Sequence, residues 1–268
     1  MASAGIPAAS ALERIIRRDR LLLSLGLLSI LVLSWIYLIN ASAGMRSMLS
    51  EAEMHAAMGM AGMQSWPREL LALFVMWAVM MVGMMLPSAA PLILLILGVY
   101  RRREDHHTRL NSLLFLGGYL LVWTLFSLVA ASGQIALHRA ALLSAEMATR
   151  SGVLAAGILI ITGVYQWLPM KGACLAHCRS PLSFLSHHWR EGRFGAVRMG
   201  FVHGLFCVGC CWALMALLFI AGVMNLLWVA AIAVFVLVEK LSRQGLIFGR
   251  VAGVLLIGWG AYLLVRII

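Results

Sequence analysis

The chain has 268 residues, of which 63% are hydrophobic and 12% charged, and its mean hydropathy is +0.96. Soluble domains contain about 45–50% apolar and about 25% charged residues. A soluble globule of this length has no means of hiding so much apolar surface, so the composition excludes a water-soluble enzyme, a disordered protein and a secreted disulfide scaffold. The net charge of +11 is assigned to membrane orientation, and nucleic-acid binding is not expected.

The apolar residues gather in seven stretches, and each is predicted to be a helix because lipid offers no other partner for backbone N–H and C=O groups. The expected fold is all-α, a polytopic transmembrane bundle of about seven spans that forms one domain over residues 1–268. The stretches are 21–40, 69–99, 111–132, 152–168, 200–222, 225–239 and 246–266.

Residues 1–20 form a basic segment that carries Arg14, Arg17, Arg18 and Arg20 and resembles a signal anchor. A small-residue site at 41–43 leaves cleavage as the alternative. With the N-terminus inside, 16 of the 21 Lys and Arg residues fall on the inner side, as the positive-inside rule requires. The chain is therefore expected in the bacterial inner (cytoplasmic) membrane as a multi-pass protein among membrane lipids, with its N-terminus cytoplasmic. If the fifth and sixth stretches form one broken element, the C-terminus moves inside.

A methionine-rich segment, residues 43–67, follows the first stretch and is predicted to be a periplasmic loop. Its candidate ligands are Met54, His55 and Met58. Clustered thioethers are soft ligands that select Cu(I), and they bind without losing a proton. The alternative is that methionine serves here as a flexible filler.

The second stretch contains Pro87 and Pro91, and a kink is predicted at Pro87 because proline removes a helical hydrogen bond. Met76, Met80 and Met84 recur every four residues and share one face, with Met81 and Met85 beside them. Packing is the favoured interpretation of these methionines, and metal ligation is the alternative.

Two clusters of cysteine and histidine are the strongest chemical signals. Cys174, His177 and Cys178 follow the fourth stretch, where one helical turn would bring them to a single ion. His203, Cys207 and Cys211 are spaced by four in the fifth stretch, and Cys210 lies one turn beyond Cys207. Thiolates and imidazoles suit Cu(I), Zn(II) and iron–sulfur centres. Both clusters are expected near the inner face.

The remaining polar residues are expected mostly at the membrane interfaces, without a chemical role. Glu239 and Lys240 are expected as a snorkelling pair at the inner interface, with Glu239 as a ligand or ligand-orienting carboxylate in the alternative. His187 and His188 lie among arginines and are expected to be solvated or lipid-facing. The sequence shows no nucleophile–base triad and no phosphate-binding glycine loop, so a non-enzymatic role is favoured.

The chain resembles the DUF2182 family, described as predicted metal-binding integral membrane proteins. The resemblance covers roughly residues 70–265 and implies a metal-binding membrane protein. The stretches that carry it are Met84–Pro91, Gly117–Trp123, Tyr165–Lys171 with Cys174, Cys178 and Arg179–Pro181, then His203–Met215, Gly222–Asn225 and Glu239–Lys240.

These features predict a membrane protein that binds a transition metal and serves metal transport, storage or delivery. Copper(I) is the favoured ion, and zinc or another soft metal is the alternative. A periplasmic metallochaperone and a membrane metalloenzyme complex are the expected partners. The alternatives from other classes are a membrane thiol–disulfide oxidoreductase, with exchange between the two cysteine clusters, and a non-catalytic subunit of a larger membrane complex.

Overall fold

The computed structural model describes residues 7–57, 66–103, 107–140, 142 and 149–267, with side chains outside the description for residues 7–17 and 45–57. This part of the chain is built from helices, which confirms the predicted all-α class. The helices are α1 (Pro7–Ala57), α2 (Trp66–Arg102), α3 (Thr108–Arg139), α4 (Gly152–Tyr165), α5 (Pro169–Arg179), α6 (Pro181–His188), α7 (Gly192–Ala216), α8 (Leu218–Ala221), α9 (Leu226–Leu241) and α10 (Gly245–Ile267).

Five helical segments of the described chain are long and apolar enough to cross a membrane. A sixth span results if α4 and α5, which are bent by 66° at the break between them, count as one. Seven were expected. The sixth stretch does not qualify because α9 has 16 residues and a length of about 24 Å, against a hydrocarbon core of about 30 Å. The five segments are Arg18–Gly44, Trp66–Arg102, Thr108–Arg139, Gly192–Ala221 and Gly245–Ile267.

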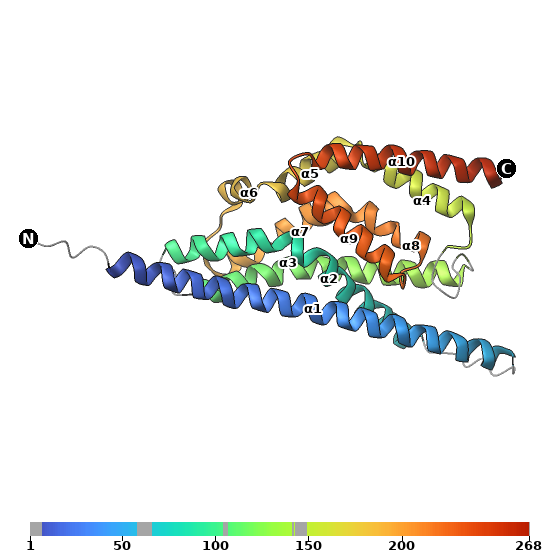
Figure 1. The fold of residues 1–268 in the computed structure, drawn as a ribbon, viewed down its shortest axis with the longest axis horizontal. Helices are drawn as coiled ribbons and strands as arrows, with labels where there is room; N and C mark the ends of the chain where they lie inside the picture. Colours follow the sequence, from blue (N-terminus) through green and yellow to red (C-terminus); the bar gives the residue numbers. More distant parts are fainter. Residues whose placement is uncertain (1–6, 58–65, 104–106, 141, 143–148, 268) are drawn as a thin grey trace, which may run out of the picture.

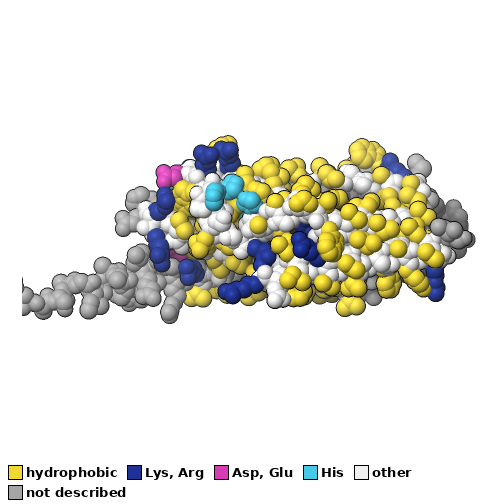
Figure 2. Space-filling model, turned by 90° about the horizontal axis from the view of Figure 1, so that it is seen from above, with side chains coloured by type: hydrophobic (Ala, Val, Ile, Leu, Met, Phe, Trp, Pro, Cys, Tyr) yellow, Lys and Arg dark blue, Asp and Glu magenta, His cyan; other side chains and the backbone are white. Residues whose placement is uncertain are grey.

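The helices form an elongated bundle with α1 along one side and the pair α4 and α10 along the other (Figure 1). Between them lie α2, α3, α7 and α9. The most extensive contacts join α3 with α7, α4 with α10, and α2 with both α1 and α3. Large apolar side chains of α1 and α10 remain exposed, as expected of helices that face lipid. Hydrophobic side chains cover much of the face seen in Figure 2, and most of its basic side chains lie toward one end.

α2 stays helical through both prolines, and Figure 1 shows it changing direction near its middle, in agreement with the predicted kink. Pro87 has no N–H to donate to the carbonyl one turn earlier. Two hydroxyl groups bind the backbone at this point. Ser88 Oγ donates to the Met85 carbonyl at 2.8 Å, and Tyr119 Oη of α3 donates to the same carbonyl at 3.2 Å. The hydrogen bond from Tyr119 therefore joins α3 to α2 at the kink.

A buried carboxylate ties three helices together at one end of the bundle. Asp19 of α1 is 2% exposed and binds Arg101 of α2 and Arg109 of α3, with Arg109 Nη2 2.7 Å from Asp19 Oδ1. Arg103 pairs with Glu191 at 3.0 Å near the same end of α2. The sequence places all of these residues on the inner side, and the structure brings them together.

α3 and α7 approach each other closely because glycines occupy their contact. A Cβ at Gly118 of α3 would lie 2.9 Å from the backbone nitrogen of Phe201. A Cβ at Gly200 of α7 would run into the backbone of α3 at Phe115 and Tyr119. Small residues permit this approach between membrane helices. The contact places Tyr119 of α3 directly against the cysteine-bearing turn of α7.

We predict that Gly118→Ala destabilises the protein by about 1–3 kcal/mol, the usual cost of overpacking, because the methyl group would push α3 away from α7. Thermal unfolding of the purified protein in detergent measures the effect. Gly117→Ala is the matched control, since a Cβ at Gly117 meets no atom within 4 Å. Equal melting temperatures for the two variants would contradict the proposed contact.

Candidate metal site

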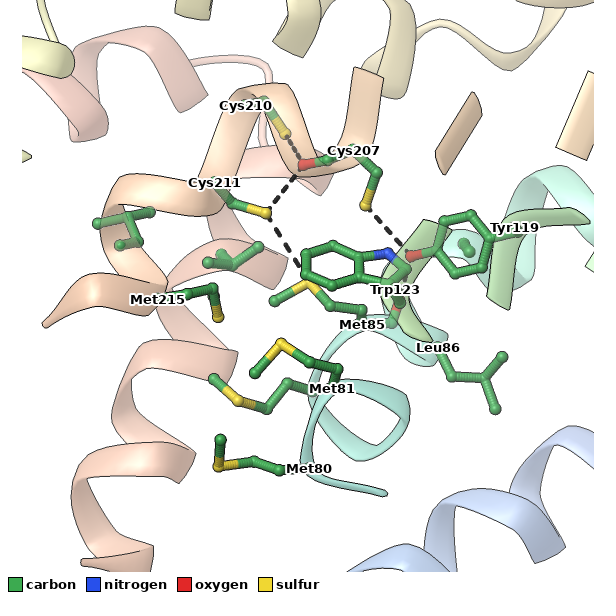
Figure 3. Packing of buried hydrophobic residues seen from close by; sticks show 14 of the residues in the cluster. Met80, Met81, Met85, Leu86, Tyr119, Trp123, Cys207, Cys210, Cys211 and Met215 are labelled. Atoms are coloured by element: carbon green, nitrogen blue, oxygen red, sulfur yellow. Dashed lines mark hydrogen bonds between the residues drawn. The ribbon is translucent and has the colours of Figure 1, made fainter. Parts of the chain in front are cut away.

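The site lies in the middle of the bundle, where α7 presents its three cysteines to α2, α3, α5 and α9. Cys207, Cys210 and Cys211 are each 1% exposed. Their spacing on the helix places them on neighbouring positions of one side. The thiols of Cys210 and Cys211 donate to the carbonyl of Cys207 at 3.1 and 2.9 Å, so the side chains are held in defined rotamers. Figure 3 shows them with the residues around them.

Two sulfur pairs join α7 to its neighbours. Cys211 Sγ lies 4.0 Å from Met85 Sδ of α2, and Cys210 Sγ lies 4.0 Å from Cys178 Sγ of α5. Sulfurs that are each ~2.3 Å from a metal ion stand ~3.8 Å apart at a tetrahedral angle and ~4.6 Å apart when collinear. Both pairs fall in this range, so each can hold a soft ion with little movement.

The thiol of Cys207 also has polar neighbours from α3 and α9. Lys240 Nζ of α9 donates to Cys207 Sγ at 2.9 Å and to Ser88 Oγ at 3.2 Å. Tyr119 Oη lies 3.2 Å from the same sulfur. Lys240 is 5% exposed, and a buried ammonium group needs a compensating negative charge. Of the two hydrogen-bond partners of Lys240, Cys207 is the one suited to carry that charge, as a thiolate.

The expectation of a snorkelling pair at Glu239 and Lys240 is wrong. Both side chains are buried, because α9 packs inside the bundle against α2, α7 and α10. Glu239 forms an ion pair with Lys171 of α5, which also donates to Gln166. This buried group links α5 to α9, and it holds the cysteines of α5 against α7.

α5 reaches α7 because the chain turns by 66° after α4. Pro169 begins α5, a position where its missing N–H costs nothing. Cys174 packs on a glycine of α7, since a Cβ at Gly209 would lie 2.9 Å from Cys174 Sγ. Cys178 faces Cys210. The structure therefore brings the two predicted cysteine clusters together.

His177 does not join Cys174 and Cys178 around a common point. Its ring stacks on Phe206 of α7, with centroids 4.1 Å apart and planes 6° apart, and it meets His188 of α6 at 5.9 Å. His203 remains with the buried group: it is 3% exposed and its ring contacts those of Phe115, Tyr119 and Phe184. Its Nδ1 has no hydrogen-bond partner among the described residues.

The methionines of α2 are buried, including Met76, Met80 and Met84. Figure 3 shows sulfur atoms of Met85, Met81 and Met80 leading in turn away from Cys211, with Met215 of α7 beside them. α1 remains helical through residue 57, so part of the expected loop extends the first helix. The side chains of Met54 and His55, like the whole of Met58, lie outside the described residues.

Within the described residues, no three side chains among His, Cys, Asp and Glu converge around one point in the way a metal ion needs. The site instead offers sulfur pairs across helix contacts. Sequence reasoning assigned no role to Ser88 and Tyr119, and it placed Lys240 at the membrane interface. The available signal was a lysine at the end of an apolar stretch, which more often marks an interface.

A family model described as PpoB2, copper chaperone, matches residues 74–263. The matched segment begins within α2 and ends within α10, so it contains the cysteines of α5 and α7 together with Met85 and Lys240. No curated protein and no solved structure matches the chain. A copper-related role agrees with the sulfur pairs in the core. By this match, the chain belongs to the PpoB2 family of copper chaperones.

Proposed function

We propose that the protein is a carrier of copper(I) in the bacterial inner membrane, and that it holds the ion between paired sulfurs of α7 before delivery to a membrane metalloenzyme. The observation that carries the proposal is the pairing itself: Cys210 and Cys211 each lie 4.0 Å from a sulfur on another helix. A sulfur pair across a helix contact suits an ion that must enter and leave, because small helix movements open it.

The chemistry of the donors favours copper(I) over zinc. Thiol and thioether sulfurs are soft ligands, and a thioether is a poor ligand for harder divalent ions. The ammonium group of Lys240 lies beside Cys207 and repels a divalent ion more strongly than a monovalent one. A monovalent soft ion is therefore the cargo that fits these neighbours best.

The sulfur atoms also suggest how the ion moves. Thioethers of α2 lead toward Cys211 (Figure 3), and the thiols of Cys210 and Cys178 lie beyond it. At each step the ion binds the next sulfur before it leaves the previous one, so it is never without ligands in a low-dielectric interior. Thiolates bind copper(I) more strongly than thioethers do, so net movement runs from the methionines to the cysteines.

The wider setting follows from the same proposal. With the N-terminus cytoplasmic, the methionine-rich segment faces the periplasm, where Met54, His55 and Met58 collect copper from a metallochaperone. The charged group around Asp19, Arg101 and Arg109 then lies at the cytoplasmic interface. The protein acts as a binding and delivery protein and catalyses no reaction of its own.

We predict that the anaerobically purified full-length protein binds copper(I) with a Kd below about 1 μM. Cys210→Ser/Cys211→Ser is expected to lose most of this binding, because it removes the α7 sulfur from both pairs. Competition with a chromophoric copper(I) chelator measures the affinity, and mass spectrometry measures the metal content. A wild-type protein that fails to compete at micromolar copper(I) would exclude the carrier function.

Thiol–disulfide exchange is the second candidate function. The 4.0 Å separation between the sulfurs of Cys178 and Cys210 favours it, and the same preparation tests it. All five cysteines are free in the structure. A carrier is expected to show thiols that copper(I) protects from alkylation. Recovery of a reducible Cys178–Cys210 disulfide from protein that binds no copper would support the oxidoreductase instead.

We further predict that Met85→Leu weakens copper(I) binding by about tenfold or more, equal to about 1.4 kcal/mol, because it removes the thioether that faces Cys211. Met80→Leu is the matched control: it is also buried on α2 but lies farther from Cys211 (Figure 3). The substitution conserves volume in both cases. Chelator competition compares the variants, and equal affinities would remove Met85 from the ligand set.

A further inference from the structure

A pair of histidines outside the sulfur-rich core has a ring separation compatible with binding a metal ion between them. His177 of α5 and His188 of α6 are half-buried, and their ring centroids lie 5.9 Å apart with the planes 75° to one another. An imidazole that binds a metal at ~2.0–2.1 Å places its ring centroid ~3.2 Å from the ion, so two such rings stand ~5.2 Å apart at a tetrahedral angle and ~6.4 Å apart when collinear. The observed separation lies between these limits.

The hydrogen bonds of both rings leave the ligating nitrogen available. His177 Nδ1 lies 2.9 Å from the carbonyl oxygen of Ala173, and His188 Nδ1 lies 3.2 Å from that of Phe184. A carbonyl oxygen only accepts, so each Nδ1 carries the hydrogen. In the neutral ring the lone pair is then on Nε2. A metal-binding histidine is commonly oriented by such a bond from its other nitrogen.

Aromatic rings hold the two imidazoles in place. His177 stacks on Phe206, and His188 stacks on Phe184 with centroids 4.8 Å apart and planes 12° apart. Phe184 in turn contacts the buried ring of His203 edge to face at 5.1 Å. The positions along the chain also connect this surface to the core, since His177 precedes Cys178 and Phe206 precedes Cys207.

The surroundings of the pair favour a singly charged ion. Arg190 and Arg198 line a small hollow of about 60 Å³ beside His188, together with His187. Figure 2 shows histidine side chains gathered in one place, with basic side chains in the surrounding region. The positive charges oppose a divalent ion more strongly than copper(I). Imidazole also binds copper(I) less strongly than thiolate does, which suits a place of exchange.

We infer that His177 and His188 form a second, weaker copper(I) site, where the ion passes from the cysteine core to the protein that receives it at the α5–α6 end. The binding site itself rests on the ring geometry, and its role in transfer rests on the proposed carrier function. During transfer, one Nε2 replaces one thiolate on the ion while the other sulfur is still bound, and no electron moves.

Two labels applied to the same copper(I)-loaded, full-length protein test the inference. Diethyl pyrocarbonate modifies accessible imidazole nitrogens, and a maleimide modifies free thiols, so mass spectrometry reads the histidine pair and the cysteine core separately. We expect copper(I) to slow labelling of His177 and His188 by at least about tenfold, in line with occupancy above about 90%. His187 is the internal control, because it is the neighbour of His188 on α6 and also binds a carbonyl through Nδ1.

The two labels separate the possible failures. If copper(I) protects the cysteines but slows the labelling of His177 and His188 no more than that of His187, the histidine site is overturned and the carrier function stands. Protected histidines with fully reactive cysteines would overturn the carrier function and leave a surface metal site.

We also expect His177→Gln/His188→Gln to slow the release of copper(I) from the cysteine core to a chelator by about tenfold, with equilibrium binding to the core unchanged. Stopped-flow mixing with the chelator measures this rate. His187→Gln is the matched control variant. Identical release rates for the two variants and the wild type would contradict the exchange role.

Discussion

The close approach of α3 to α7 is the constraint on which the rest of the site depends. Gly118 and Gly200 let the two backbones meet, and this brings the Tyr119 hydroxyl to both the kinked backbone of α2 and the thiol of Cys207. One side chain thereby sets the distance between the helix that carries the methionines and the helix that carries the cysteines. Larger residues at the two glycines would separate the very sulfurs that the proposed function requires close together.

The second constraint on the site is that each buried charge needs a compensating partner. Lys171 is paired with Glu239, and Lys240 has the sulfur of Cys207 and the hydroxyl of Ser88 as partners. Such groups are expensive inside an apolar bundle unless each is compensated. Their cost is consistent with a functional centre, because ionisable residues within membrane segments commonly mark the path of a substrate or ion. The ion pair also fixes α5, so the packing of the bundle and the chemistry of the sulfurs depend on the same contacts.

The separation of soft sulfurs in the interior from imidazoles near the surface provides two kinds of donor at different depths for the proposed copper(I) sites. The sulfurs of Cys178 and Cys210 lie within the bundle, while His177, one residue away from Cys178, faces the aromatic group of Phe206 and His188. Adjacent residues on α5 thus serve different environments, as the helical period requires. In the proposed carrier, weaker donors outside stronger ones would provide an intermediate step between the core and a partner.

Much of this protein could be predicted from its sequence. Apolar composition demands membrane helices, Pro87 bends the second one, and a four-residue period places Cys207 and Cys211 on one side of α7. These are local properties, set by hydropathy, proline geometry and helical pitch. Only the tertiary structure decided that Cys178 meets Cys210, that Met85 is the methionine facing Cys211, that His177 leaves the cysteines, and that Lys240 is buried. Those outcomes depend on which helices are neighbours. The neighbours are set by packing between residues distant in the chain, through the 66° turn before α5 and the glycine contact of α3 with α7.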